Sequence, residues 1–372
     1  MTVLHINLNY NQSSLYEQLS NHLLMRGCNH NVFYPCIEGK AISNPPSYLI
    51  QPSILNKYDR LFFNRRNKKI IDYMKLNFEF NNISLFHAHS LFSNGMIAYT
   101  LKKQFKIPYI VAVRDTDINV FFKKMKHLKH KGINILREAD KIIFLSKPYK
   151  NYLLNKIVPK NMKYKLDKKI EVIPNGINPY WLDNLNSYTN VNSLPKKNNK
   201  IKILSVGLIN KRKNQLTTAK ACQILQEQDK KIEFIIVGKI TDKNYFKKLS
   251  QFNFIKYIPH VNKEALKEIY RNSDVYVMPS ITETFGLTYA EAMSQGLPIL
   301  YSKGQGFDEQ FNDGVVGFSV DNNELDISEK IMLATNHKEI LRDNSLQAIP
   351  KFSWKKIAGE YIKLYELILN KK

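Results

Sequence analysis

The sequence predicts an α/β protein built from two doubly wound domains, each with a parallel sheet covered by helices on both faces. Short apolar runs of strand length alternate with helical patterns along the whole chain, and this alternation restarts after a polar stretch at residues 183–200. A chain of 372 residues is also too long for one ordinary core. We therefore predict a first domain over 1–182, a linker over 183–200, a second domain over 201–350, and a C-terminal helix within 351–372 that packs toward the first domain.

The first half contains strand patterns separated by amphipathic helices. A strand is predicted at 3–9 and a helix at 14–27, in which Leu15, Leu19 and Leu23 share one face and Gly27 ends the helix. Further strands are predicted at 83–89, 107–114, 141–146 and 169–176, and a further helix at 94–105.

The second half repeats this order of elements after the linker, which is rich in Asn and almost free of apolar periodicity. Strands are predicted at 200–207, 231–238, 254–259, 274–280 and 297–302, and helices at 214–228, 263–273 and 289–296. The last helix carries an apolar stripe made of Ile357, Tyr361, Leu364 and Ile368.

Composition indicates an intracellular enzyme or binding protein. No apolar run approaches the roughly 20 residues that cross a bilayer, and the N-terminus lacks the pattern of a signal peptide. The three cysteines have no paired spacing, which indicates a reducing compartment and buried apolar roles. We expect a cytoplasmic protein, with the inner face of the plasma membrane as a further location.

The charge is strongly positive, with 56 Lys and Arg against 32 Asp and Glu, or +24. Residues 1–180 carry 28 basic and 11 acidic residues (+17), whereas residues 181–372 carry 28 and 21 (+7). Such a field attracts polyanions: nucleic acid, an anionic membrane or phosphorylated substrates. General enrichment in Lys on solvated faces is the alternative explanation.

Two carboxylates surround a glycine turn in the second half. Glu283 precedes Gly286, and Glu291 follows it by about one helical turn, directly after a buried strand pattern. Ligands of parallel sheets bind beyond the carboxyl ends of strands, and the free N–H groups of a helix start attract phosphate. The segment therefore offers a phosphate seat flanked by two hydroxyl acceptors, as a sugar nucleotide requires. The alternative is an acid at a helix start and a solvated helical residue.

The run at 283–300 resembles the E-x7-E motif of retaining glycosyltransferases of family 4, which have the GT-B fold. That fold consists of two Rossmann-like domains that face each other across a cleft. The resemblance extends over nearly the whole chain and is most specific over 200–321. Further matching segments lie at 86–90, 111–117, 172–177, 205–217, 273–280 and 304–321.

This resemblance implies roles for individual residues. Glu291 is expected to bind the ribose hydroxyls, Glu283 to contact the transferred sugar, and Lys213 to neutralise the leaving diphosphate without a metal. The N–H groups of Phe285, Gly286 and Leu287 are expected to hold the distal phosphate and sugar hydroxyls. Thr284, Arg212, Gly207 and His260 complete the expected donor side.

The chain also departs from the family pattern. Leu208 stands where many relatives have Arg, so Arg212 or Arg271 is expected to make that diphosphate contact. Arg114 stands where many have His, and Asp117 or Asp115 is expected to take over part of its polar role beside the transferred sugar. A Gly-Gly loop after the first strand is absent, and Ser13 or Ser14 is expected to supply its contacts on the acceptor side.

His87 and His89 end the strand at 83–89 and face the same side of it. His89 is expected either to touch substrate on the acceptor side or to make a structural hydrogen bond. A metal would need a third ligand, and none is evident nearby in the sequence. No metal or other cofactor is expected.

The implied reaction transfers a hexose or N-acetylhexosamine from a nucleoside diphosphate sugar to a hydroxyl group. UDP is favoured because it is common in the family, and the acceptor is a glycan or a lipid-linked glycan of a bacterial surface polysaccharide. The family implies retention of configuration. Both carboxylates come from one side, which suits binding better than the double displacement of retaining glycosidases.

Basic and apolar residues are mixed at 118–132, and a second basic cluster lies at 65–69. They could hold the first domain against an anionic membrane, or form a core helix with a basic outer face.

Two other functions compete. Asp115 and Asp117 form a D-x-D pattern, as in Mn²⁺-dependent glycosyltransferases of another fold, and a non-enzymatic nucleic-acid binder would explain the charge. Neither explains the Glu283–Glu291 motif, and we expect no nucleic-acid partner.

Overall fold

The computed structural model describes residues 2–60, 62–186 and 200–370, which form two compact units. Unit 1 consists of the described residues within 1–145, 150–176 and 354–372, and unit 2 of those within 146–149 and 177–353. The chain passes from one unit to the other at 145/146, 149/150, 176/177 and 353/354. Most of the linker predicted at 183–200 lies outside the described residues.

Each unit contains one parallel sheet. The strands of unit 1 are β1 (Val3–Ile6), β2 (His30–Phe33), β3 (Leu49–Ile50), β4 (Leu85–Ala88), β5 (Tyr109–Ala112), β6 (Lys141–Phe144) and β7 (Ile170–Val172). The strands of unit 2 are β8 (Lys200–Val206), β9 (Lys231–Val237), β10 (Ile255–Ile258), β11 (Val275–Met278), β12 (Ile299–Ser302) and β13 (Gly317–Val320). Their spatial orders are β3-β2-β1-β4-β5-β6-β7 and β10-β9-β8-β11-β12-β13. The predicted pair of doubly wound parallel domains is confirmed.

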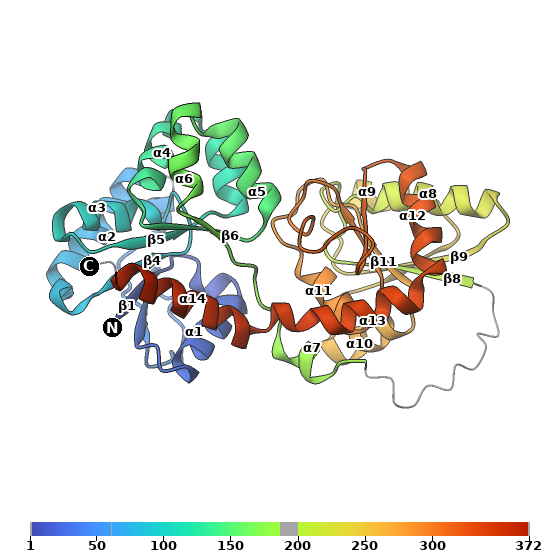
Figure 1. Cartoon of the computed structure of the whole chain (residues 1–372), viewed down its shortest axis with the longest axis horizontal. Coiled ribbons are helices and arrows are strands. Elements are labelled where there is room, and N and C mark those ends of the chain that lie inside the picture. The colour runs from blue at the N-terminus through green and yellow to red at the C-terminus, as the bar shows by residue number, and fades with distance from the viewer. Residues whose placement is uncertain (1, 61, 187–199, 371–372) are drawn as a thin grey trace. The chain divides into compact units, whose positions relative to one another are not determined.

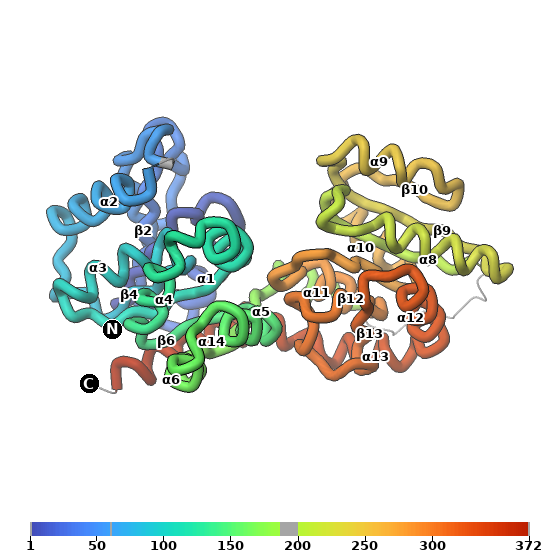
Figure 2. Tube along the Cα trace, turned by 90° about the horizontal axis from the view of Figure 1, so that it is seen from above, coloured from blue at the N-terminus to red at the C-terminus, as the bar shows by residue number. Residues whose placement is uncertain are grey.

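The helices surround these sheets (Figure 1). They are α1 (Ser14–Met25), α2 (Phe63–Asn77), α3 (Gly95–Phe105), α4 (Lys129–Glu138), α5 (Lys147–Tyr152), α6 (Lys163–Asp167), α7 (Pro179–Asp183), α8 (Gln215–Glu227), α9 (Lys243–Leu249), α10 (Lys263–Arg271), α11 (Leu287–Ser294), α12 (Glu324–Asn336), α13 (Lys338–Ala348) and α14 (Trp354–Leu369). In unit 2, α8 and α12 lie side by side in both views (Figures 1 and 2) and share one apolar cluster.

Helix α1 shows how the local sequence sets an element. The Ser13 hydroxyl accepts a hydrogen bond from the Leu15 N–H at the helix start, and Gly27 adopts φ +74° just beyond its end. Leu19 and Leu23 are buried against the sheet. The same core takes in residues of α14, which lies beside α1 in Figure 1.

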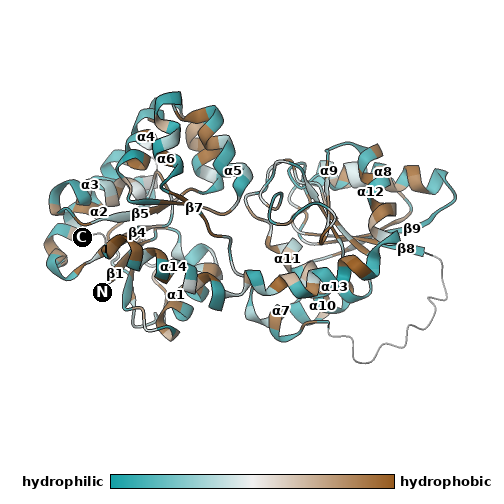
Figure 3. Ribbon diagram, in the orientation of Figure 1, coloured by the Kyte–Doolittle hydropathy of each residue, from teal (hydrophilic) through white to brown (hydrophobic). Residues whose placement is uncertain are grey.

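Helix α14 brings the C-terminal segment into the core of unit 1. Ile357, Tyr361, Leu364 and Ile368 are all buried, and the covering helices carry both hydrophobic and hydrophilic residues (Figure 3). At its start the Trp354 indole lies so close to Gly176 that no side chain fits at that position. The stripe read from the sequence is therefore the packing face of this helix.

The segment at 118–132 turns its largest apolar groups inward. Ile118, Phe122 and Leu128 are buried, whereas Val120 is exposed, as are four of the lysines. This is the arrangement of a core segment with a basic outer face. Among the described residues, no helix combines the length and apolarity that a membrane crossing requires.

Two details differ from the expected elements. The first half contains the additional strands β2 and β3 on the far side of β1. Residues 304–321, which resembled a loop, end in strand β13, where Gly317 packs on the Ile299 backbone. The sequence does not predict this strand, because it begins at a glycine and lacks the alternation of apolar and polar residues. At Gly317, close backbone contact replaces side-chain packing.

Candidate functional site

The strand order of unit 2 reverses direction at β8 and β11, which are hydrogen-bonded neighbours. The loop after β8 covers residues 207–214, and the loop after β11 covers residues 279–286. Ligands of open α/β sheets bind at such a switch point, outside the carboxyl ends of the strands. The loops at 207–214 and 279–286, which carry Lys213 and Glu283, therefore lie where this fold favours ligand binding.

An ion pair joins these two loops. Lys213 Nζ lies 2.5 Å from a carboxylate oxygen of Glu283, and both side chains are largely shielded from solvent. Arg212 Nη1 lies 3.9 Å from the same oxygen and donates a hydrogen bond to the Thr282 carbonyl at 2.9 Å. Gly207 lies against the Lys213 stem, since a Cβ there would be 3.6 Å from Cε. Two cations facing one carboxylate leave a net positive charge for an anion.

The loop that carries Glu283 is held by a third loop, after β12. The Gln305 side-chain oxygen accepts a hydrogen bond from the Glu283 N–H at 3.0 Å, and the Gly306 N–H donates to the Glu283 carbonyl at 2.6 Å. A Cβ at Gly306 would collide with the backbone of Thr284. Sequence reasoning missed this clamp, although both residues lie in the glycine-bearing segment at 304–321.

Helix α11 begins without a side-chain cap. Gly286 is its N-cap residue in a left-handed conformation, φ +84°, and no side chain accepts a hydrogen bond there. A side chain at Gly286 would also collide with the Tyr289 ring. The first N–H groups of the helix, such as that of Leu287, therefore have no side-chain cap, and N–H groups in this position can bind an anion. Phe285 is buried next to Gly286.

Glu291 lies in the second turn of α11 and has different partners from Glu283. Its carboxylate accepts a hydrogen bond from Tyr270 Oη at 3.4 Å. Burial raises the pKa of Glu291 to about 7, while Tyr270 and the charge of Lys263 act in the opposite direction. A carboxyl group in this environment changes its charge close to neutral pH.

His260 occupies a different part of the same edge. It is exposed and follows β10, which β9 separates from β8. Arg271 donates from Nε to the Gln295 side chain at 2.9 Å and from Nη2 to the Asn184 carbonyl at 3.0 Å. These bonds give Arg271 a structural environment, so Arg212 is the better placed replacement for the missing arginine at Leu208.

The candidates of the first half lie in unit 1. Ser13 caps α1, and Ser14 is exposed in its first turn. Arg114 Nε donates to the His89 carbonyl at 3.0 Å.

Asp117 is buried. Its carboxylate accepts the N–H groups of Leu91, Phe92 and Arg114 at 2.9–3.1 Å. Burial raises the pKa of Asp117 to about 6, and these donors oppose the shift. Three backbone donors on a buried carboxylate indicate a structural role, and they would compete with a metal ion for the oxygens of a D-x-D site.

A cluster of histidines covers one face of the unit 1 sheet. Strand pairing places His5 of β1 opposite His87 of β4. His5 Nδ1 lies 2.9 Å from His89 Nε2, and His87 Nδ1 lies 2.8 Å from Tyr365 Oη of α14. The sequence showed no third histidine near His87 and His89, and the β1–β4 pairing supplies one.

These three histidines are the only group among the described residues whose donor atoms gather closely enough for a metal, within 4.8 Å of one another. Two ligands of one tetrahedral zinc lie about 3.3 Å apart, so the cluster would have to contract. The rings of His87 and His89 are stacked, with their centroids 4.2 Å apart. Burial lowers the pKa of His87 to about 3 and those of His5 and His89 as well. The arrangement is that of buried neutral imidazoles, in which one nitrogen of each ring is hydrogen-bonded and the other has no hydrogen-bond partner among the described residues.

Comparison with known proteins gives the class of this chain. Residues 13–180 match the family model described as Glycosyltransferase Family 4, and residues 187–349 match the one described as Glycosyl transferases group 1. With two parallel α/β units and these two matches, the chain is a glycosyltransferase with the GT-B fold. It is of the family 4 type.

Individual relatives agree with this class. An uncharacterized glycosyltransferase of Methanocaldococcus jannaschii is 28% identical over 77% of this chain and 76% of its own length. The alpha-monoglucosyldiacylglycerol synthase of Acholeplasma laidlawii is 27% identical over 78% of this chain and 75% of its own length.

Solved structures share the fold. Sucrose-phosphate synthase from Thermosynechococcus elongatus has a TM-score of 0.75 at 16% identity, and the match covers 100% of both chains. HepE from Anabaena, in complex with UDP and glucose, has a TM-score of 0.65 at 15% identity, over 98% of this chain and 99% of that one.

Proposed function

We propose that this glycosyltransferase transfers a hexose or N-acetylhexosamine from a UDP-sugar to a hydroxyl of a glycan or lipid-linked acceptor, with retention of configuration. The observation that carries the proposal is the Lys213–Glu283 ion pair beside the uncapped start of α11 at the switch point of unit 2. An anion seat and a hydroxyl acceptor in adjacent positions match the two halves of a sugar diphosphate.

Each group has a defined task in this mechanism. Lys213, Arg212 and the first N–H groups of α11 stabilise the negative charge that develops on the leaving diphosphate. This charge stabilisation needs no metal. Because the groups are fixed before the donor binds, no rearrangement is needed during bond cleavage.

Glu283 has a different task from the cations. Its carboxylate holds Lys213 and accepts hydrogen bonds from the hydroxyls of the transferred sugar. With Lys213 at 2.5 Å, it is a weak nucleophile, which favours same-face attack by the acceptor over a covalent glycosyl-enzyme. Glu291, in its ionised form, accepts the ribose hydroxyls.

UDP is proposed as the nucleotide because HepE binds UDP in the same fold. A lipid-linked acceptor is proposed because the Acholeplasma relative is, by its name, the synthase of a glucosylated diacylglycerol. The role in surface-polysaccharide synthesis is proposed from the family resemblance alone. Exposed lysines 123, 124, 126 and 129 of unit 1 give that unit a basic face for an anionic bilayer. Sedimentation with anionic but not neutral vesicles is expected; equal binding to both, or to neither, would refute this membrane role.

The donor assignment is tested with a thermal-shift screen of UDP-, ADP- and GDP-sugars. We expect one UDP-sugar to stabilise the wild type and to lose that effect in Glu291→Ala. Glu264→Ala, an exposed acid on the nearby α10, is the matched control and should respond as the wild type does. No stabilisation by any sugar nucleotide would contradict the proposal. Release of UDP on adding acceptors, with the product anomer read by NMR, then tests transfer and retention.

A further inference from the structure

Unit 1 contains a polar pocket of about 400 Å³ at the carboxyl ends of its strands. Its walls come from the loops that follow β1, β2 and β4 and from the region before and within α2. This position lies next to the β1–β4 switch point of the unit 1 sheet, where α/β folds place ligands. The volume falls in the range of small-molecule sites.

Arg66 gives the pocket an uncompensated charge. Its side chain is largely buried, with Nη2 donating to Ser93 Oγ at 3.3 Å and Nε to Asn67 Oδ1 at 3.4 Å. The guanidinium also stacks on the Phe63 ring, 5.3 Å from its centroid. Among the described residues, no carboxylate lies within 4.0 Å of it. Partly buried arginines normally have an anionic partner, so this one is prepared to receive an anion.

The acidic group of the pocket is already occupied. Asp59 accepts the Asn56 N–H at 2.8 Å and lies 3.5 Å from Lys69 Nζ. Burial lowers the pKa of Arg66, and Asp59 only partly opposes this shift. Asp59 thus interacts with both Lys69 and Arg66, and one carboxylate shared by two cations leaves a net positive charge.

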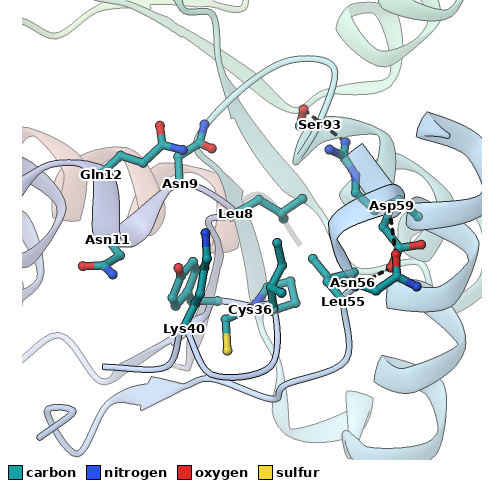
Figure 4. A pocket seen from close by; sticks show the side chains of 14 residues that line it. Leu8, Asn9, Asn11, Gln12, Cys36, Lys40, Leu55, Asn56, Asp59 and Ser93 are labelled. Carbon is teal, nitrogen blue, oxygen red and sulfur yellow. Dashed lines mark hydrogen bonds between the residues drawn. The ribbon is translucent and has the colours of Figure 1, made fainter. Parts of the chain in front are cut away.

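The opposite wall supplies a second cation and several amides. Figure 4 shows Lys40 with Asn9, Asn11 and Gln12 on one side, and Asp59 and Ser93 on the other. Lys40, Asn11 and Gln12 are exposed. Amides both donate to and accept from hydroxyl groups, whereas Lys and Arg bind phosphate oxygens. The lining thus combines the contacts for a sugar with the contacts for a phosphate.

We propose that this pocket binds the acceptor, and that the acceptor is a sugar carrying a phosphate or diphosphate group held by Arg66 and Lys40. The inference rests on the proposed function, because it names the substrate class of the transferase. The sugar hydroxyls contact Asn9, Asn11 and Gln12. A free sugar phosphate and a lipid-linked sugar diphosphate share this chemistry.

The test measures binding of defined probes to the full chain saturated with UDP, so that the phosphate contacts of unit 2 are filled. Calorimetry compares N-acetylglucosamine 1-phosphate, glucose 6-phosphate, N-acetylglucosamine and a short-chain prenyl diphosphate N-acetylglucosamine. We expect at least one phosphorylated probe to bind tenfold or more tightly than neutral N-acetylglucosamine. Arg66→Gln should weaken that binding by roughly tenfold or more, since it removes charge-assisted hydrogen bonds.

Arg65→Gln is the matched control, because Arg65 is the exposed neighbour on α2 and does not line the pocket. It should bind every probe as the wild type does. Both variants should keep the wild-type UDP affinity and the wild-type urea unfolding of unit 1, followed by Trp354 fluorescence in a Trp181→Phe background, which shows that the unit carrying Arg66 is folded. If the wild type did not bind UDP, the donor proposal would be contradicted. The acceptor proposal would still be judged by the binding of the phosphorylated probes.

The probes also separate the two acceptor sources. Comparable binding of free and prenyl-linked phosphates identifies a free sugar phosphate as sufficient, and binding of the prenyl diphosphate alone identifies a lipid-linked acceptor. The proposal is overturned if no phosphorylated probe binds, if neutral N-acetylglucosamine binds equally well, or if Arg66→Gln binds like the wild type while retaining UDP.

Discussion

Lys213 and Glu283 form an ion pair at 2.5 Å although 70 residues separate them in the sequence. The pair exists because β8 and β11 are neighbours in the sheet and their following loops meet at one edge. Two charges in a shielded position stabilise each other only if both remain, so the pair also orients Lys213 for a second anion. The proposed chemistry depends on this lysine.

Lys213→Ala is expected to lower kcat by about 10²–10³, because it removes a preorganised charge from the leaving group. The KM for the acceptor should change little, since Lys213 belongs to unit 2 and the proposed acceptor pocket to unit 1. Steady-state release of UDP measures both constants. Lys211→Ala, an exposed lysine two positions earlier, should keep wild-type rates. Equal losses in both variants would mean that general positive charge, and not this position, supports the reaction.

Glu291 predicts a pH-dependent donor affinity. Its pKa is raised to about 7, so the carboxylate that accepts ribose hydroxyls is lost as the pH falls through 7. UDP titrations should show affinity that rises between pH 6 and pH 8 in the wild type. Glu291→Gln should bind more weakly, by about tenfold at pH 8, and with no such rise. A parallel rise in Glu291→Gln would assign the titration to another group.

The same carboxyl group affects stability with the opposite slope. Folded Glu291 keeps its proton to a higher pH than the unfolded chain, whose value is near 4.5, so its burial costs stability as the pH rises from about 4.5 to about 7. Glu291→Gln removes that cost and should be more stable than the wild type at pH 8 by about 1–3 kcal/mol. Urea unfolding at pH 5 and pH 8 measures the difference. Glu264→Gln should show none.

Much of the site could be predicted from local sequence. The position of Glu283, Gly286 and Glu291 relative to a buried strand and a helix start follows from neighbouring residues alone, and the structure has that strand and helix. Lys213 was identified because residues 205–217 resemble the phosphate-binding loop of the family, and its strand–glycine–loop setting agrees with that role. In each of these cases the relevant geometry lies within about fifteen residues of one strand end.

Features that depend on strand pairing could not be predicted in this way. The clamp of Glu283 by Gln305 requires β12 to lie beside β11, and the His5–His89 contact requires β1 beside β4. The family resemblance gave Asp117 a possible polar role beside the transferred sugar, because Arg114 stands where many relatives have His. In the structure, backbone donors from the loop after β4 surround Asp117. Which distant strands pair, and in which register, cannot be predicted from neighbouring residues in a single sequence.

The histidine cluster predicts acid sensitivity of unit 1. Burial lowers the pKa of His87 to about 3, whereas the unfolded chain binds a proton near 6.5. The free energy of unfolding is therefore unaffected by this histidine's titration above about pH 6.5. Below that it falls as the pH decreases toward 3, by about 1.4 kcal/mol per pH unit for each such histidine. His87→Phe should show a shallower slope than the wild type. The variant loses the hydrogen bond to Tyr365 and should be less stable at pH 7.5. This loss lowers the free energy of unfolding but does not change its slope against pH.

The measurement can isolate this unit, because the two tryptophans lie in different units, Trp354 in unit 1 and Trp181 in unit 2. In a Trp181→Phe background, the fluorescence of Trp354 reports unfolding of unit 1 at pH 7.5 and pH 5. His127→Phe removes an exposed histidine of the same unit and should keep the wild-type slope. An unchanged slope in His87→Phe would mean that His87 is protonated in the folded protein.

Substitution of Gly306, an uncharged residue, is expected to weaken donor binding. A methyl group there would collide with the backbone of Thr284 and Phe285, so Gly306→Ala must displace the loop that holds Glu283. UDP affinity should fall tenfold or more, and unit 2, followed by Trp181 in a Trp354→Phe background, should lose about 2–4 kcal/mol. Gly304→Ala is the matched control: it has φ +71° and open space around its Cβ, so only backbone strain of about 1 kcal/mol is expected. If Gly306→Ala bound UDP normally, the loop after β12 would not position Glu283, and the clamp would have no part in donor binding.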